Sequence, residues 1–273
     1  MEMILRIVSV GPGRPGWLTV EAVERIRASD VVAVPAPRGE EATGPGGSLA
    51  LKAASSYVPA GAEVLRLDLP MTYDVTVLEE GWKAAAEKVL ERLRAGRRVS
   101  MLVLGDASLY GTGAYVAREV VALDPSVRIE VTPGVSSPSA CASLLGEPLA
   151  MGNDNVTIVP DSEIDDSLVR ALSMGGTVIL MKLSRSIRNV LAHLDRRGLL
   201  DHARCVIRAG QEGEEVVRDV RTLRGRDVPY MSTMVVKIPA PVEESGPVSS
   251  VALSFSSRMG GGGKIFLVGI GPG

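Results

Sequence analysis

The first half of the chain alternates short apolar runs with stretches in which apolar residues recur every three or four positions. Runs of the first kind predict buried strands at 4–10, 31–34, 99–104 and 127–131. The other stretches predict helices between them, at about 20–26, 78–95 and 114–122. The first of these helices has Thr19 as a candidate N-cap and Glu21 in its first turn. Strands that alternate with helices are typical of a mainly parallel sheet covered by helices.

The second half repeats this alternation after a break at Pro133 and Gly134. Strands are expected at 156–159, 177–181, 205–208 and 231–238, with helices near 166–174 and 188–197. A hairpin-like stretch at 215–219 indicates a mixed sheet. The fold class is therefore α/β, with an N-terminal α/β domain at 1–132 and a C-terminal α/β domain at 133–238.

The last part of the chain has a different composition. Residues 239–263 are rich in Pro, Ser and Gly, which is typical of a linker. Residues 264–273 read KIFLVGIGPG and resemble LRIVSVGPG at 5–13. The repeated phrase predicts the truncated start of a second, fused module of the same kind.

Composition excludes several classes of function. The chain has 273 residues, a formal net charge of −2 and only 3% aromatic residues, which argues against a nucleic-acid surface. Cys141, Cys205, His193 and His202 show no metal-ligand spacing, so no metal site is expected. No apolar run reaches the ~18 residues of a membrane span, and the amino terminus lacks a signal-peptide pattern, so a cytoplasmic location is expected.

Three turns that contain glycine follow predicted strands of the first half. They lie at 11–13 (GPG), 105–110 (GDASLY) and 133–137 (PGVSS). Ligands of open α/β sheets bind beyond the carboxyl ends of the strands, so these turns are expected to meet at one crevice. None matches the dinucleotide or P-loop motifs. Each turn alone is more often structural than functional.

Taken in order, these stretches resemble the tetrapyrrole methylases, enzymes that methylate corrin and sirohaem precursors with S-adenosylmethionine. The matching segments are VSVGPGRPGWLTVEAVERIRASDVVAV at 8–34, LVLGDASLYGTG at 102–113, VTPGVSSPSA at 131–140 and TVILMKL at 177–183. The resemblance implies two α/β domains with the cofactor cleft between them and contacts made mostly by backbone. The cofactor-binding residues that it implies are Pro12, Gly105, Asp106, Leu109, Tyr110, Ser136, Ser137, Met181 and Ala209.

Two residues depart from the family pattern. Relatives usually have GDP where this chain has Gly105-Asp106-Ala107, and many have glycine where this chain has Ser9. The loss of proline removes a restraint on φ, so the loop is expected to be less rigid. Asp106 is expected near the sulfonium or the ammonium group of the cofactor, the alternative being that its carboxylate only caps the turn.

Further segments resemble the C-20 methyltransferases that act on precorrin-2 or cobalt-factor II in cobalamin synthesis. They are VP-x-x-R-G at 34–39, a helix start at Ser48 to Leu51, and Pro70 to Thr72. Arg38 and Lys182 are candidates for binding carboxylates of the tetrapyrrole, with solvated surface cations as the alternative. The methyl group of a sulfonium is a ready electrophile, so no catalytic acid or base is assigned.

The resemblance also implies a homodimer. Other functions stay open at this stage. They are another methylase of the corrin or sirohaem route, the related diphthine synthase, and a nucleotide-binding sensor without catalysis.

Overall fold

The first sheet of the protein is entirely parallel and is formed by the first half of the chain. The computed structural model describes residues 2–36, 47–70, 72–160 and 166–239. Its first sheet has the order β3-β2-β4-β1-β5, and every pair of neighbours is parallel. The strands are β1 (Ile4–Ser9), β2 (Val31–Ala36), β3 (Glu63–Asp68), β4 (Val99–Val103) and β5 (Arg128–Thr132). The predicted parallel sheet is confirmed.

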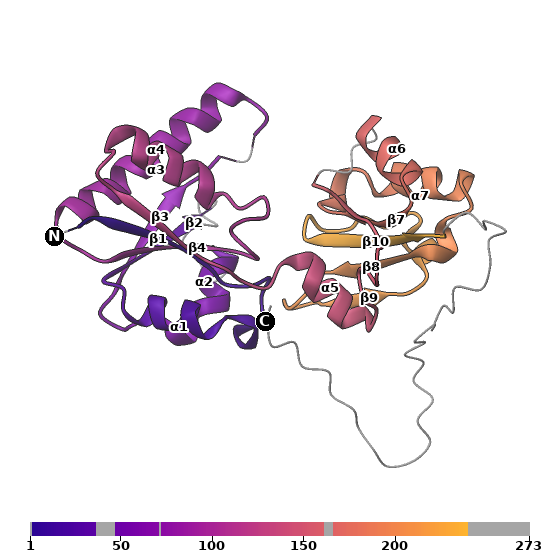
Figure 1. Ribbon diagram of the computed structural model, residues 1–273, viewed down its shortest axis with the longest axis horizontal. Helices are drawn as coiled ribbons and strands as arrows, with labels where there is room; N and C mark the ends of the chain where they lie inside the picture. Colours follow the sequence, from indigo (N-terminus) through magenta and orange to yellow (C-terminus); the bar gives the residue numbers. More distant parts are fainter. Residues whose placement is uncertain (1, 37–46, 71, 161–165, 240–273) are drawn as a thin grey trace, which may run out of the picture. The chain divides into compact units, whose positions relative to one another are not determined.

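Helices cover both faces of this sheet. Figure 1 shows α3 and α4 on one side of the strands and α1 and α2 on the other. Alternate strand residues divide accordingly: Leu5 and Ile7 belong to the apolar cluster under α3 and α4, and Val8 and Val10 to the cluster under α1 and α2. The helices are α1 (Val20–Arg27), α2 (Leu49–Ala54), α3 (Val75–Arg94) and α4 (Gly113–Leu123). None of the helices in the described ranges combines the length and apolarity of a membrane span.

Side-chain caps set the beginnings of three of these helices. The predicted cap Thr19 is confirmed, because its hydroxyl accepts a hydrogen bond from the backbone N–H of Ala22 at 3.2 Å. Ser48 caps α2 through Leu51 in the same way. Asp74 accepts from the N–H groups of Thr76 and Val77, so α3 begins at Val75, earlier than the predicted Leu78.

The second sheet is mixed, as the hairpin-like stretch predicted. Its order is β6-β7-β10-β8-β9, in which only β6 and β7 pair in parallel. The strands are β6 (Val156–Val159), β7 (Gly176–Leu180), β8 (Ala203–Ile207), β9 (Glu215–Val217) and β10 (Ser232–Ile238). Its helices are α5 (Ser137–Leu145), α6 (Asp166–Ser173) and α7 (Ile187–Arg196). The helix α5 packs on one face and α6 and α7 on the other (Figure 1).

Two elements were not anticipated from the sequence. The strand β3 carries alternating apolar residues, of which Leu65 and Leu67 are buried, but it lies at the edge of the sheet. The helix α5 is built largely of Ser and Ala and has no pronounced apolar stripe. Each signal was too weak to separate the element from the adjoining turns.

The predicted domain limits fall between the two sheets. The first sheet ends at Thr132 and the second begins at Val156, so the boundary at 133 stays a prediction. Contacts join residues 1–240 into one compact unit. The predicted linker at 239–263, apart from residue 239, and the repeated phrase at 264–273 lie outside the described residues.

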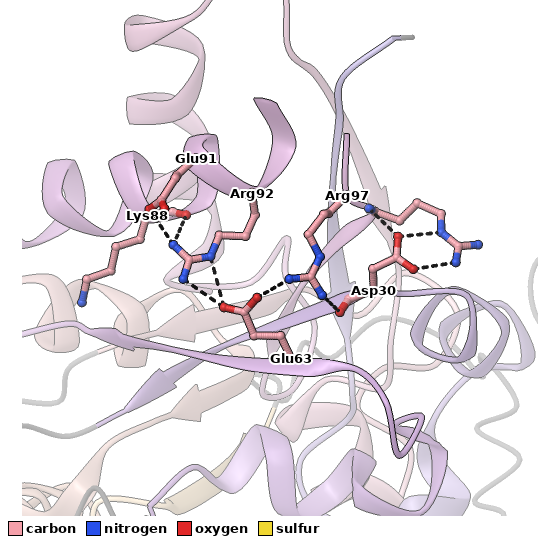
Figure 2. Close-up of polar contacts among 7 residues, drawn as sticks. Asp30, Glu63, Lys88, Glu91, Arg92 and Arg97 are labelled. Carbon is pink, nitrogen blue, oxygen red and sulfur yellow. Dashed lines mark hydrogen bonds and ion pairs between the residues drawn. The ribbon is translucent and has the colours of Figure 1, made fainter. Parts of the chain in front are cut away.

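A network of ion pairs ties together the amino ends of the parallel strands (Figure 2). The Glu63 carboxylate, at the start of β3, accepts from Arg92 of α3 at 3.0 Å and from Arg97 at 2.5 Å. Arg97 also donates to the backbone carbonyl of Asp30 at 2.8 Å. Hydrogen bonds and charge from Arg98 hold the pKa of the Asp30 carboxyl well below its usual value. One network therefore fixes the start of β2, β3 and β4 and the end of α3.

We expect Glu63→Gln to lower the free energy of unfolding by about 1 to 2 kcal/mol at low salt, because two arginines lose a shared, partly buried carboxylate. Urea denaturation measures the loss, which shrinks at high salt as the charges are screened. Glu91→Gln is the matched control: Glu91 also pairs with Arg92 but is 75% exposed, so its loss stays within about 0.5 kcal/mol. Equal losses from the two variants would contradict the role of Glu63.

Candidate active site

A pocket of about 520 Å³ lies at the carboxyl ends of strands of the first sheet, at the carboxyl ends of β7 and β8 and at the amino end of β10. All the residues predicted to bind the cofactor line it, and so does Lys182. Arg38 lies outside the described residues. Lining residues that were not among the predicted site residues are Pro35, Ala36, Gly47, Ser48, Leu49, Ala50, Leu69, Pro70, Val103, Leu104, Gly111, Thr112, Val206, Gln211, Tyr230, Met231, Ser232 and Thr233.

The turns after β1 and β4 are joined backbone to backbone. Gly11 donates to the carbonyl of Gly105 at 3.1 Å, and Gly105 donates to the carbonyl of Gly11 at 2.8 Å. Both glycines have positive φ, +68° and +77°, a conformation that disfavours any residue with a Cβ. This reciprocal pair brings two of the predicted turns together at the pocket.

The third turn packs against the same place through Gly134. A Cβ on Gly134 would lie 2.5 Å from the Cβ of Ser9 and 3.0 Å from the carbonyl oxygen of Gly105. Ser9 is fully buried at the end of β1. The turns at 11–13, 105–110 and 133–137 therefore meet, as the order of strands and turns predicted.

The two departures from the family pattern contact each other. The Ser9 hydroxyl oxygen accepts a hydrogen bond from the backbone N–H of Ala107 at 2.9 Å. A proline at 107 has no N–H to donate, and a glycine at 9 has no hydroxyl to accept it. The expected loss of rigidity in the 105–110 turn is therefore offset by a buried hydrogen bond to β1.

Asp106 holds two of the turns in place. One carboxylate oxygen accepts from the N–H of Gly134 at 2.6 Å, and the other from the N–H of Ser108 at 2.8 Å and from the Ser108 hydroxyl. Burial alone would raise the pKa of this carboxyl, but these hydrogen bonds outweigh it and lower the pKa. Asp106 therefore caps the turn, as the alternative interpretation predicted. Its carboxylate also stays charged at the pocket wall.

The second sheet contributes a wall that touches the GPG turn. Gln211, after β8, donates its side-chain N–H to the carbonyl of Pro12 at 2.8 Å. Glu214 accepts from Arg14 at 2.5 Å and from the N–H of Gly210 at 2.7 Å. A Cβ on Gly13 would lie 2.6 Å from the carbonyl oxygen of Gly210. These contacts connect the opening turn with the segment that holds Ala209.

The predicted serine pair lies at the beginning of α5. The Ser136 hydroxyl accepts from the N–H of Ser139 at 3.3 Å and so caps the helix. Ser137 is the first residue of α5. Both line the pocket, which places the positive end of the helix dipole at its wall.

Three residues other than glycine have positive φ in the described part of the chain, and all lie at the pocket or next to it. They are Tyr110 (56°), Lys182 (58°) and Arg208 (51°). Tyr110 and Lys182 line the pocket, and Arg208 precedes the lining residue Ala209. Backbone strain of this kind gathers at functional sites.

The residues that sequence reasoning missed come from both halves of the chain, most of them at 35–36, 47–50, 69–70, 103–104 and 111–112 and the others at 206, 211 and 230–233. Gln211 follows the predicted strand at 205–208, and Tyr230 directly precedes the predicted strand at 231–238, but their turns carry no recognisable motif. The polar run GQEGEE at 210–215, directly after a buried strand, was the available signal for Gln211.

The buried cysteines take no part in the pocket lining. Burial raises the pKa of the Cys141 and Cys205 thiols to about 12, so neither is a nucleophile near neutral pH. In the described ranges, no three His, Cys, Asp or Glu residues gather as a metal site would require.

We expect Ser9→Gly and Ala107→Pro to be coupled. Each single change leaves a buried polar group without its partner and lowers the free energy of unfolding by about 1 to 2 kcal/mol. The double variant removes both groups, so its loss falls short of the sum by about 1 kcal/mol. A double-mutant cycle by urea denaturation measures the coupling. Additive losses would show that the Ser9–Ala107 hydrogen bond contributes nothing.

The Asp106 carboxylate should stabilise the fold in a pH-dependent way. Its pKa is lower in the folded state, so its contribution is complete above the unfolded pKa of about 4 and is lost as the pH falls through the folded value. We therefore expect Asp106→Asn to destabilise the protein at pH 7, by an amount that shrinks progressively as the pH falls below about 4. Urea denaturation across this range tests it. Asp154→Asn, which removes a carboxylate that accepts a hydrogen bond from the N–H of Met151 at 2.9 Å, is the control; an equal pH-dependent loss there would refute the assignment.

Comparisons with known proteins agree with this geometry. The chain is 29% identical over 233 residues to a cobalt-precorrin-2 C(20)-methyltransferase of Salmonella typhimurium, covering 85% of this chain and 95% of that protein. It is 31% identical over 241 residues to a precorrin-2 C(20)-methyltransferase of a Sinorhizobium species, covering 84% and 93%. The solved structure of the cobalt precorrin-4 methyltransferase CbiF matches the fold with a TM-score of 0.66 at 22% identity, over 86% of this chain and 95% of that one.

The family expected from the motifs is confirmed by a match along most of the chain. The model of the family described as Tetrapyrrole (Corrin/Porphyrin) Methylases covers residues 5–223, a span that contains the three joined turns and both sheets up to β9. The enzyme class predicted from the sequence, a methyltransferase, is confirmed with it. The chain belongs to the tetrapyrrole methylases.

Proposed function

We propose that this chain is an S-adenosylmethionine-dependent C-methyltransferase that methylates C-20 of precorrin-2 or cobalt-factor II in cobalamin biosynthesis. The observation that carries the proposal is the meeting of three glycine turns at one pocket, in a chain whose relatives are named for this reaction. The pocket volume lies in the range of small-molecule sites.

The residues present fit the cofactor. Gly105 lines the pocket, and because a Cβ there would enter open space, its missing side chain lets an adenosine approach the backbone closely. The charged Asp106 suits the cationic end of the cofactor, and the beginning of α5 at Ser136 suits its carboxylate. We assign Met181 and Ala209 to the adenine side.

The role of the protein is to hold and orient the cofactor and the substrate and to exclude water from them. When bound, the cofactor supplies an electrophilic methyl group on its sulfonium. The chain presents a largely apolar wall, in which Leu69, Val103 and Leu104 exclude water from the reacting atoms. Orientation of an electron-rich ring carbon toward the methyl group then supplies most of the rate enhancement. No side chain needs to move a proton for the bond to form.

Incubation with S-adenosylmethionine and either metal-free precorrin-2 or cobalt-factor II tests the proposal. We expect the product mass to rise by one methyl group, and ¹³C-methyl NMR to place that group at C-20. Methylation at another carbon would instead favour another corrin-route methylase. Tight binding of S-adenosylhomocysteine with no methylation of any tetrapyrrole would favour a sensor, and no binding would overturn the cofactor assignment.

Tyr110→Phe should keep measurable turnover. The Tyr110 side chain is 48% exposed, and its hydroxyl lies 3.5 Å from the carbonyl oxygen of Ile158, so its removal costs little binding. We expect kcat within about tenfold of the unchanged protein. A complete loss of turnover with S-adenosylhomocysteine binding intact would show that the phenol is a catalytic group.

A homodimer and a cytoplasmic location stay predictions. Sedimentation of the purified protein tests the first.

A further inference from the structure

The described lining of the pocket contains few charged side chains. Among the lining residues that the structure describes, only Asp106 and Lys182 carry a formal charge. The Asp106 carboxylate accepts hydrogen bonds from the N–H groups of Ser108 and Gly134, and it faces the region assigned to the cationic cofactor. Lys182 is therefore the one lining cation, in the described part of the chain, left to meet an anionic group of a second ligand.

Lys182 is held in a costly conformation. It follows β7 with φ 58° and ψ 47°, the left-handed region that glycine adopts freely and lysine does not. Its ammonium lies 5.7 Å from the centre of the Tyr230 ring, also in the pocket lining. In the described ranges it forms no ion pair with an acidic side chain. The strain places a cation, backed by an aromatic ring, at the pocket.

Arg185 lies on the helical turn that Lys182 begins, Leu183–Arg185. Its guanidinium donates to the Tyr73 hydroxyl at 3.2 Å and lies 5.4 Å from the centre of the Tyr73 ring. Tyr73 comes three residues after the lining residue Pro70. No acidic partner of Arg185 exists among the described residues, whereas its neighbour Arg188 pairs with Asp227 at 3.4 Å.

We propose that Lys182 and Arg185 form a carboxylate-binding pair at the mouth of the pocket, and that Tyr230 and Tyr73 hold the two cations in place. The inference rests on the proposed function, because a corrin precursor carries acetate and propionate side chains around its ring. A point charge and a planar fork on one short turn can grip neighbouring carboxylates and so fix the rotation of the ring. The pair determines which carbon faces the methyl donor.

Three charge variants test the pair: Lys182→Met, Arg185→Gln and, as matched control, Arg188→Gln. The first probe is uroporphyrin, a porphyrin rich in carboxylates, followed by fluorescence quenching, with its methyl ester as a second control. We expect each of the first two variants to weaken uroporphyrin binding about tenfold, and Arg188→Gln to leave it unchanged. Calorimetry with S-adenosylhomocysteine should give the same affinity in all three.

With the proposed substrate, the same variants should raise KM about tenfold and change kcat less, since ground-state binding is lost. Losses also in Arg188→Gln, or wild-type affinity in Lys182→Met and Arg185→Gln, would overturn the pair even where the unchanged protein methylates precorrin-2. Failure of the unchanged protein to methylate any tetrapyrrole, with uroporphyrin binding intact, would overturn the proposed function instead.

Lys182→Gly separates binding from folding. Glycine relieves the left-handed strain, so this variant should unfold at the same or a higher urea concentration than the unchanged protein. It should nevertheless bind uroporphyrin about as weakly as Lys182→Met. A less stable Lys182→Gly protein that binds uroporphyrin normally would show that Lys182 serves the fold and not the ligand.

Discussion

The close approach of three backbone turns is the constraint on which the pocket depends. Gly11 and Gly105 exchange hydrogen bonds at positive φ, and Gly134 packs so tightly on Ser9 that no Cβ fits there. This contact is possible because β4, β1 and β5 are adjacent and parallel, so that their carboxyl ends reach the same edge. The ion network around Glu63 anchors the opposite edge, at the amino ends of β2, β3 and β4 (Figure 2). Order at one edge of the sheet thus supports order at the other.

The fold and the first wall of the site were predictable because both rest on local signals. Apolar periodicity in the sequence predicts buried strands and amphipathic helices, and the hydroxyl of Thr19 predicts the beginning of a helix. The turns at 11–13, 105–110 and 133–137 follow directly from those strands. The strand β3 and the helix α5 escaped because an edge strand and a helix of small residues have weak patterns. Tertiary packing, absent from a local window, decides such segments.

The second wall could not be predicted in the same way. Gln211 reaches Pro12, and Glu214 reaches Arg14, across about two hundred residues of sequence. No spacing rule connects such partners, because they meet only when both sheets have formed. The Ser9–Ala107 hydrogen bond is an instructive intermediate case. Ser9 and Ala107 each differ visibly from the family pattern in the sequence. That the Ser9 hydroxyl bonds to the Ala107 N–H became visible only when the distance between them was known.

The charged lining residues Asp106 and Lys182 make two sides of the pocket electrostatically different. The Asp106 carboxylate is fixed at the joined turns by three donors, which lower its pKa and keep it ionised without a counter-ion. Lys182 stands at the end of β7, in the other sheet, with its ammonium over Tyr230. A cationic donor and a polyanionic acceptor that enter this pocket therefore have different favourable positions, one near each charge. Because the lining between these two residues is largely apolar, the attraction of each ligand to its own charge is weakly screened. In the proposed function, the same two charges disfavour the reversed arrangement of cofactor and substrate, so they would set the relative placement of the two ligands before any reaction occurs.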